Sequence, residues 1–327
     1  MERRTRIEWH ADGTFEPLNA ARDANRPTRP HVVVVGQAGR DVVLSVGTVP
    51  DPGGSVTVDE RIEILGGKGA NQAIGLQQLG AKARLVAVVG EDAQGTSMLQ
   101  QIVDAEVNAD SVVRRGTTAL LVDVVDNEGA NRLIEDVPPE SLLTMNDVDA
   151  AESRGVFDGA DVVCLQLQQP GDVLVRAATH ARWRDVRVLL DGAVEGRERD
   201  ELVSLSQVVR ADAHEAELLT GSRVQSVDDA SRAAHSLLAD GPELVVLAIE
   251  DRGEFAAWRG GAVFVPFGDD PVVDPTGGGD AFVAGLVTGL NAGLGPERAV
   301  RFASRAAAST IGHLGGRPDL AHLDPHN

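Results

Sequence analysis

Short, continuously apolar segments are the feature that most constrains how this 327-residue chain can fold. The first is residues 31–36 (HVVVVG), and similar runs recur at 84–89, 161–167, 186–190 and 244–249. Such runs are typical of strands buried on both faces. The amphipathic segments between them predict helices over 70–79, 94–104, 172–181, 227–239, 280–291 and 296–311. This alternation predicts an α/β fold with a doubly wound, mostly parallel sheet flanked by helices, and ligands at its carboxyl edge.

Two predicted hairpins interrupt the alternation. One joins 42–45 to 55–65, and the other joins 118–125 to 131–135. Hairpins cannot continue a parallel sheet, so we expect a separate small sheet that serves as a lid. The predicted organisation is a mobile extension over 1–30, an α/β domain over 31–320 with a lid formed by about 42–65 and 117–136, and a tail over 321–327.

Composition excludes several classes of function. Lys and Arg total 30 against 50 Asp and Glu, a net charge of −20, which argues against a chain that binds mainly nucleic acid or anionic membrane. Cys164 is the single cysteine, so no disulfide within the chain and no cysteine cluster for a metal is expected. No apolar run approaches the ~20 residues of a membrane span. We therefore predict a cytoplasmic protein with no nucleic-acid or membrane partner.

The first glycine-rich turn covers residues 66–73 (GGKGANQA) and opens a helix that ends before Gly80. Its glycines let the backbone approach a ligand, and the free N–H groups of a helix start favour polar or anionic partners. Lys68 and Asn71 add a charge and an amide. It is not a P-loop, because Gly69 follows Lys68 where a Ser or Thr is needed. A tight turn with an exposed lysine is the alternative interpretation.

The second turn covers 274–280 (DPTGGGD) and also opens a helix. Three consecutive glycine N–H groups and the helix dipole predict an anion hole. Asp280 lies in the first helical turn, where its negative charge would repel a phosphate that is merely bound. The pair makes sense for phosphoryl transfer: amides neutralise the growing charge while the carboxylate takes the proton of the attacking hydroxyl. The alternative is a structural aspartate at a helix start.

Together the two turns resemble the two signatures of the ribokinase-like sugar kinase family, in the family's order and about 200 residues apart. The resemblance covers residues 32–318. It implies a doubly wound sheet with a β lid, and transfer of the γ-phosphate of ATP to a primary hydroxyl of a sugar, with ribose or a related furanose favoured. It also implies Mg²⁺ and K⁺ as cofactors, and sugar and ATP as partners. Independently of the resemblance, a lid with an exposed sheet edge can pair with a second copy, which predicts a homodimer through the lid.

The resemblance assigns roles by position. The catalytic residues would be the base Asp280 and the anion-hole residues Gly277, Gly278 and Gly279. The sugar would contact Asp41, Gly67, Lys68, Asn71, Gln168 and Asp280. The nucleotide would contact Asp212, Ala248, Glu250, Gly253, Gly277, Gly279 and Ser304. Glu215 would hold Mg²⁺ through water, and Asp274 and Thr276 would bind the monovalent cation.

Several positions differ from the ribokinase pattern. Gly39 stands in place of an Asn that touches the sugar, and Gln168 in place of a common Glu. Glu250 replaces a residue near the nucleotide, where a carboxylate would repel triphosphate by roughly 1 kcal/mol or more unless it is paired, for example with Arg252. Two alternatives therefore stay open, a nucleoside kinase and an inactive sugar-binding homologue. The hairpins contain no aromatic residue to stack a base, which disfavours the nucleoside kinase.

Overall fold

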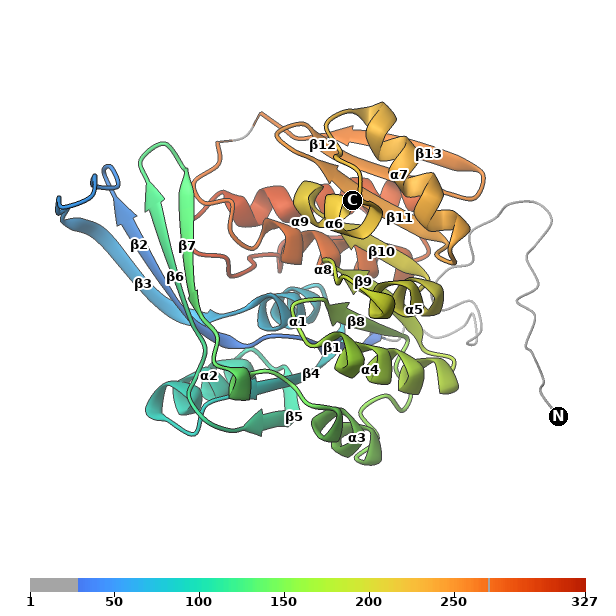
Figure 1. Ribbon diagram of the computed structural model, residues 1–327, viewed down its shortest axis with the longest axis horizontal. Helices are drawn as coiled ribbons and strands as arrows, with labels where there is room; N and C mark the ends of the chain where they lie inside the picture. Colours follow the sequence, from blue (N-terminus) through green and yellow to red (C-terminus); the bar gives the residue numbers. More distant parts are fainter. Residues whose placement is uncertain (1–28, 270) are drawn as a thin grey trace.

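A nine-stranded sheet forms the centre of the computed structural model, which describes residues 29–269 and 271–327 (Figure 1). The predicted extension over 1–30 lies almost wholly outside these residues. The strand order is β13 (Gly261–Pro266), β12 (Gly253–Trp258), β11 (Leu244–Ile249), β10 (Val208–Ala211), β9 (Arg187–Asp191), β8 (Val162–Gln166), β1 (His31–Val35), β4 (Lys82–Val89) and β5 (Asn108–Arg114). In this order, all neighbours from β11 through β10, β9, β8, β1 and β4 to β5 pair in parallel, and β12 and β13 add an antiparallel edge.

Helices cover both faces of this sheet. One face packs against α1 (Lys68–Gln78), α2 (Ala93–Asp104), α8 (Gly278–Asn291) and α9 (Pro296–Ile311). The other packs against α3 (Met145–Ser153), α4 (Gly171–Trp183), α5 (Arg197–Leu205), α6 (Ala213–Thr220) and α7 (Val227–Ala239).

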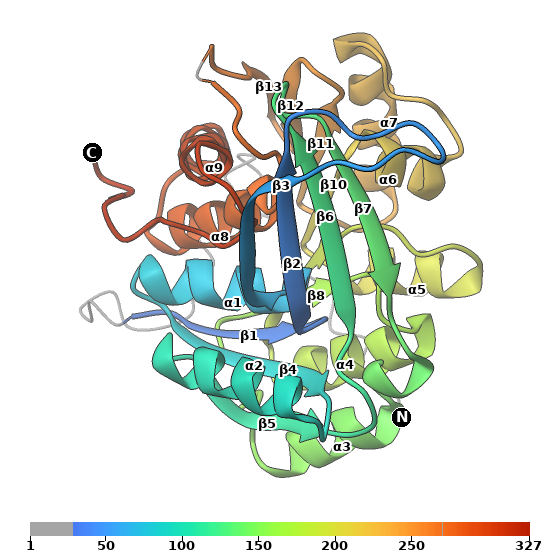
Figure 2. The same ribbon diagram turned by 90° about the vertical axis from the view of Figure 1, so that its left-hand side faces the viewer.

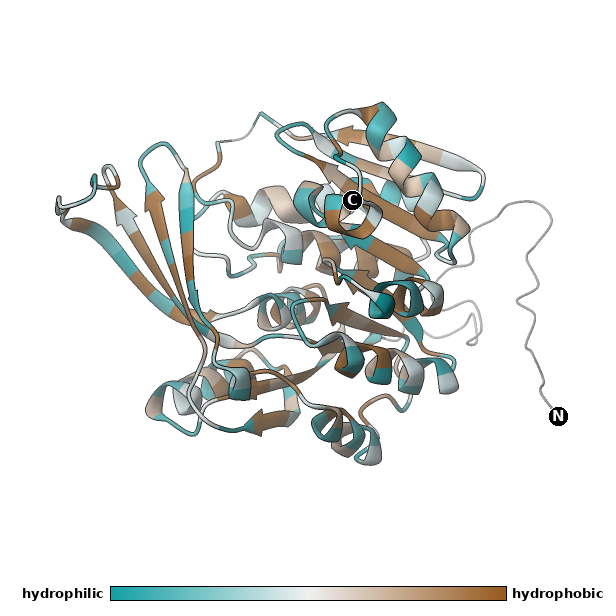
Figure 3. Cartoon of the chain, viewed as in Figure 1, coloured by the Kyte–Doolittle hydropathy of each residue, from teal (hydrophilic) through white to brown (hydrophobic). Residues whose placement is uncertain are grey.

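Strand β1 shows why the apolar runs are continuous. Val32 and Val34 belong to the first core, whereas Val33 and Val35 belong to the second, and all four are fully buried. Side chains of a strand alternate between faces, so a strand covered on both sides needs apolar residues throughout. Figure 3 shows the resulting apolar central strands between helices whose outer sides are polar.

The predicted hairpins form a separate four-stranded sheet with the order β3 (Val58–Gly66), β2 (Gly39–Val46), β6 (Leu120–Asp126) and β7 (Asn131–Asp136). The two hairpins join through a parallel β2–β6 pair. In Figure 2 this small sheet stands in front of the main body, across the ends of the central strands. We call it the small sheet below.

The α/β fold class is confirmed, as are the five predicted central strands and six predicted helices. The sequence analysis missed strands β5, β10, β12 and β13 and helices α3, α5 and α6. These elements are short or carry charged residues inside them, so their periodicity is weak. The missed strand β10 matters most, because it carries a residue of the candidate site.

Candidate active site

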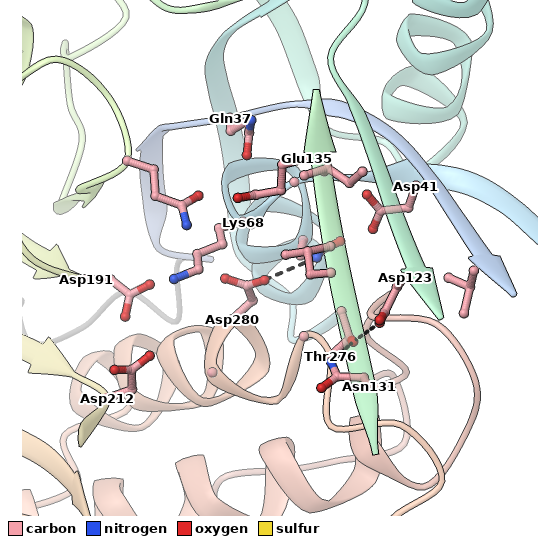
Figure 4. A pocket seen from close by; sticks show the side chains of 18 of the residues that line it. Gln37, Asp41, Lys68, Asp123, Asn131, Glu135, Asp191, Asp212, Thr276 and Asp280 are labelled. Atoms are coloured by element: carbon pink, nitrogen blue, oxygen red, sulfur yellow. Dashed lines mark hydrogen bonds between the residues drawn. The ribbon is translucent and has the colours of Figure 1, made fainter. Parts of the chain in front are cut away.

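A cavity of about 360 Å³ lies between the carboxyl edge of the large sheet and the small sheet (Figure 4). Its walls come from both sheets and from the N-terminal ends of α1 and α8. Its lining residues are Gln37, Asp41, Val43, Gly67, Lys68, Asn71, Leu121, Asp123, Asn131, Leu133, Glu135, Gln168, Asp191, Arg210, Asp212, Thr276, Gly277, Gly279 and Asp280. The edge where parallel strands end is the usual place for a ligand in this architecture.

The first glycine turn packs tightly around a carboxyl group. A Cβ atom built on Gly66 would lie 1.8 Å from Cγ of Asp41, so the carboxyl group of Asp41 occupies the space of the missing side chain. Gly67 has a φ of +88°, which glycine adopts without strain. These glycines therefore shape the cavity wall, a role that the sequence analysis did not assign to Gly66.

Asp41 is buried in this wall and carries an unsatisfied acceptor. It is 7% exposed, and its Oδ1 atom has no hydrogen-bond partner in the described structure. Burial, followed by the negative charges of Asp280 and Asp123, raises the pKa of Asp41 to about 7. A ligand that donates hydrogen bonds would satisfy this oxygen.

The second glycine turn begins α8. Gly277 is the N-cap residue with a φ of +76°, and a Cβ atom there would lie 2.0 Å from the carbonyl oxygen of Gly316. A Cβ atom on Gly279 would lie 2.8 Å from a guanidinium nitrogen of Arg210. Only glycine fits at position 277, whereas a side chain at position 279 would displace the guanidinium group of Arg210. The start of α8 borders the cavity, where its free N–H groups favour an anion.

Asp280 lies in the first turn of α8, is 5% exposed, and points into the cavity (Figure 4). Nδ2 of Asn71 donates to its Oδ2 atom at 3.1 Å, and Nε2 of Gln72 donates to its Oδ1 atom at 3.2 Å. Burial and the charge of Asp191 raise the pKa of Asp280 to about 7, against the opposing effects of Lys68 and the two amides. A carboxylate with this pKa can accept a proton near neutral pH.

Lys68 connects the first turn to α6. Its Nζ atom lies 2.8 Å from Oε1 of Glu215. Burial opposes the charge on Lys68, but Glu215, Asp191 and Asp280 together raise its pKa above the ordinary value, so the lysine stays charged. Its ammonium group lies between Asp191 and Asp280 in Figure 4, which excludes the alternative of an exposed surface lysine.

Comparison with known proteins agrees with this geometry. The sequence profile described as "pfkB family carbohydrate kinase" matches residues 29–322. The chain belongs to this family. Members of the pfkB family are sugar kinases, phosphotransferases with an alcohol group as acceptor, so the predicted family and enzyme class are confirmed.

Two relatives of this pfkB kinase are named ribokinase. The chain is 28% identical to ribokinase of Haemophilus influenzae over 294 residues, which is 89% of this chain and 95% of the relative. It is 30% identical to ribokinase of Mus musculus over 260 residues, 78% of this chain and 80% of the relative. A structure of Arabidopsis thaliana ribokinase complexed with ribose and ATP is similar, with a TM-score of 0.74, 25% identity, and 89% and 96% of the two chains covered.

Some, but not all, of the predicted nucleotide-binding residues of this pfkB kinase line one cavity. A second cavity of about 470 Å³ adjoins the first and shares Asp212 with it. Ala248 and Glu250 line this second cavity, but Gly253 and Ser304 are not among its described lining residues. Among the described interactions, Arg252 donates to the carbonyl oxygen of Gln225 at 3.4 Å rather than to Glu250.

The predicted magnesium residue has both carboxylate oxygens engaged. Oε1 of Glu215 pairs with Lys68, and its Oε2 accepts the N–H of Asp212 at 2.8 Å as part of a capping box. The described residues contain no group of three His, Cys, Asp or Glu side chains that could enclose a metal ion. An ion here would bind through water and substrate phosphates, which is the usual mode of Mg²⁺.

The predicted monovalent-cation residues hold the loop before α8. Asp274 is fully buried, and its two oxygens accept the N–H groups of Thr276 at 2.9 Å and Gly315 at 2.8 Å. The hydroxyl of Thr276 donates to Asp123 of the small sheet. Each oxygen of Asp274 thus accepts one backbone hydrogen bond and retains further acceptor capacity, and the monovalent-cation site stays a prediction.

The sequence analysis missed several residues of the site. Asp191 ends β9, Asp123 lies inside β6, and Arg210 lies in the unpredicted strand β10. Asp191 could have been found, because it directly follows a buried strand at the edge where ligands bind. Gln72 lies inside the first signature, but nothing in the sequence shows that its side chain reaches Asp280.

Within the described residues, no helix is long and apolar enough to span a bilayer.

Proposed function

We propose that this pfkB kinase transfers the γ-phosphate of ATP to the primary hydroxyl of a sugar, with ribose or a related furanose favoured. One observation carries the proposal. Asp280 is buried at the first turn of α8, in the same cavity as Lys68 and Asp41. The proposed base, the proposed anion hole and a polar wall thus border one cavity.

In the proposed step, Asp280 accepts the proton of the sugar hydroxyl as its oxygen attacks the γ-phosphorus. The new O–P bond forms while the bond from phosphorus to the leaving oxygen of ADP breaks, and ADP departs with the electron pair. The N–H groups at Gly277, Gly278 and Gly279 stabilise the charge on the transferred group. Lys68 adds a fixed positive charge beside the base.

The sugar end of the cavity is rich in free acceptors. Oδ1 atoms of Asp41, Asn71 and Asp123 are buried and have no partner in the described structure. Hydroxyl groups of a sugar would donate to them, and a sugar lacking one hydroxyl would leave an acceptor unpaired. Gln168 also lines this space and is proposed to contact the sugar with Gly67. The named ribokinase relatives support ribose as the first sugar to test.

Neither alternative gains support from the site. No aromatic residue is among the described residues that line the cavity, so a nucleobase has no side chain to stack on. The base and the three glycines are all present at the start of α8, which disfavours an inactive sugar-binding protein.

The nucleotide is proposed to lie across both cavities, past Asp212, with its base near Ala248 and Glu250. The roles of Gly253 and Ser304 stay predictions. Mg²⁺, when bound with ATP, would neutralise phosphate charge, and Glu215 is proposed to hold it through water. The monovalent-cation site at Asp274 and Thr276 also stays a prediction. Dependence of the rate on added K⁺ would test that predicted site.

Release of ADP, measured over a panel of pentoses and hexoses with Mg²⁺ and K⁺, tests the proposal. We expect turnover with at least one furanose-forming sugar, and loss of about 10²–10⁴-fold in kcat for Asp280→Asn, the range of general base catalysis. Full activity of Asp280→Asn would contradict the assigned base. Faster turnover with a nucleoside than with any free sugar would favour the nucleoside kinase.

A further inference from the structure

A row of buried polar groups runs from the large sheet to the proposed base. A guanidinium nitrogen of Arg210 lies 3.3 Å from Oδ1 of Asp191. The other oxygen of Asp191 accepts from Nε2 of Gln72 at 2.8 Å, and the same Nε2 donates to Asp280 at 3.2 Å. Gln72 is fully buried and Asp191 is 1% exposed, so neither is solvated.

Gln72 has one orientation available in this row. Its amide nitrogen carries two hydrogens, and each points to a different carboxylate. A flipped amide would place Oε1 against two carboxylate oxygens, which repel it. Oε1 has no partner in the described structure, so this orientation is set entirely by the two carboxylates.

Asp191 contacts Gln72 and Arg210 at the edge of the cavity. Although Asp191 lines the cavity, one of its oxygens faces Arg210 and the other faces Gln72. Its carboxylate and that of Asp280 share the amide nitrogen of Gln72. Removing it would free the amide to turn and would leave the base with a less fixed donor.

We propose that Asp191 is a positioning residue of this active site, which fixes the side-chain amide of Gln72 and thereby orients the carboxylate of Asp280. The inference rests on the proposed function for the role of Asp280 as base, but the hydrogen-bonded row itself does not.

The electrostatics of the site agree with the geometry. After burial, the charge of Asp191 is the largest influence that raises the pKa of Asp280. The other charged groups that face Asp280 are Lys68 from α1, which lowers that pKa, and Asp41 from β2, whose own pKa Asp280 raises. Replacing Asp191 by an uncharged residue should therefore lower the pKa of Asp280.

A purely structural role for Asp191 is the competing explanation, because a buried arginine needs a negative partner. The chain contains an internal comparison. Glu254 of β12 lies 3.7 Å from the other terminal nitrogen of Arg210, and its side chain is 5% exposed. Glu254 shares the arginine with Asp191, but among the described interactions Gln72 donates to Asp191 and Asp280 and not to Glu254.

The experiment compares Asp191→Asn with the matched control Glu254→Gln in the full-length protein. Carbon-detected NMR of Asp-labelled protein, with Asp280→Asn to assign the signal, gives the pKa of Asp280 without any need for turnover. We expect Asp191→Asn to lower it by about one pH unit and Glu254→Gln to leave it unchanged. Equal shifts in both variants, or none in either, would overturn the inference.

Kinetics provide the second readout. For Asp191→Asn we expect kcat to fall roughly tenfold and the acid limb of the kcat/KM profile to move to lower pH, with little change in KM for ATP. In a Gln72→Met background, which lacks both N–H donors, adding Asp191→Asn should cost much less in kcat. Additive losses would contradict action through Gln72.

Thermal unfolding identifies variants that fail to fold, and Gln72→Met tests the row without leaving Arg210 unpaired. A wild-type protein that phosphorylates no sugar would refute the proposed function alone, since the NMR titration would still decide the inference.

Discussion

Two carboxyl groups in one cavity, those of Asp41 and Asp280, have a pKa of about 7 but different hydrogen-bond environments. Both are raised first by burial. Asp280 accepts two hydrogen bonds from side-chain amides, whereas Oδ1 of Asp41 has no hydrogen-bond donor in the described structure. Asp41 is therefore poised to accept hydrogen bonds from a ligand, at a cost to the empty protein.

This cost predicts that Asp41→Asn stabilises the ligand-free protein at pH 8. The pKa of Asp41 rises from 3.8 to about 7 on folding, so between these values the folded state binds more protons and stability falls as pH rises. A pKa raised by one unit costs the ionised folded state about 1.4 kcal/mol. We expect a melting temperature several degrees above wild type at pH 8, and no difference at pH 4, by thermal unfolding.

Glu63→Gln on the neighbouring strand is the control for that measurement. A hydrogen bond from Arg40 lowers the pKa of Glu63, so its replacement should give no stabilisation at pH 8. If Asp41→Asn is no more stable than wild type at pH 8, the unsatisfied carboxylate is not a burden on the fold. The same variant should also lose sugar affinity, which calorimetry would show.

At the level of single residues, the site residues that lie in the two glycine-rich turns could be predicted from the sequence. Asp280, Lys68 and Asn71 were found because a helix start and a glycine turn dictate where their side chains point. Arg210 could not be found, because a charged residue in a four-residue strand gives no periodic signal. The contact of Gln72 with Asp280 depends on the packing of α1 against α8, which no local pattern encodes.

Among the elements, the small sheet is tied to the loop that precedes α8. Thr276 donates to Asp123 of β6, and Nδ2 of Asn131, at the start of β7, donates back to Oγ1 of Thr276 at 3.3 Å. One hydroxyl thus joins two strands of the small sheet to the proposed anion hole. We infer that this contact holds the small sheet over the cavity as the predicted lid.

Thr276→Val should loosen that contact while keeping the shape of the side chain. We expect KM for the sugar to rise several-fold with a smaller change in kcat, because the glycine turn itself is untouched. Hydrogen exchange in β6 and β7 should become faster. Thr276→Ser, which keeps the hydroxyl, is the control. Wild-type KM and exchange in Thr276→Val would mean that the contact does not hold the lid.

Elements long enough to show their periodicity could be predicted from the sequence, and the short ones could not. Helix α7 matches its predicted bounds. It is thirteen residues long, carries an apolar stripe and begins after the N-cap residue Ser226. Helix α6 has eight residues and begins at a capping box whose glutamate was assigned to magnesium instead. The small sheet was predicted because its hairpins break the alternation of strands and helices.

Over the whole molecule, negative charge dominates, with a formal net charge of −20. The acidic lining of both cavities adds to the repulsion of an incoming polyphosphate. We therefore expect KM for ATP to fall as ionic strength rises from about 10 to 150 mM, because salt screens long-range repulsion. Steady-state kinetics at constant K⁺ and Mg²⁺ would measure it, with KM for an uncharged sugar as the control. A KM for ATP that rises with salt would contradict this expectation.

The predicted dimer through the small sheet remains a prediction, which light scattering of the purified protein would test. Strands β3 and β7 form the two open edges of that sheet, and unpaired edges can pair with another chain.

The hydrogen bond between Asn71 and Asp280 joins residues 209 positions apart. Neither signature is therefore a self-contained module. A recombinant protein that takes one signature from a distant relative would combine two segments whose side chains do not match. We expect such a protein to fold but to turn over slowly. Shuffling experiments on this scaffold should move both segments together.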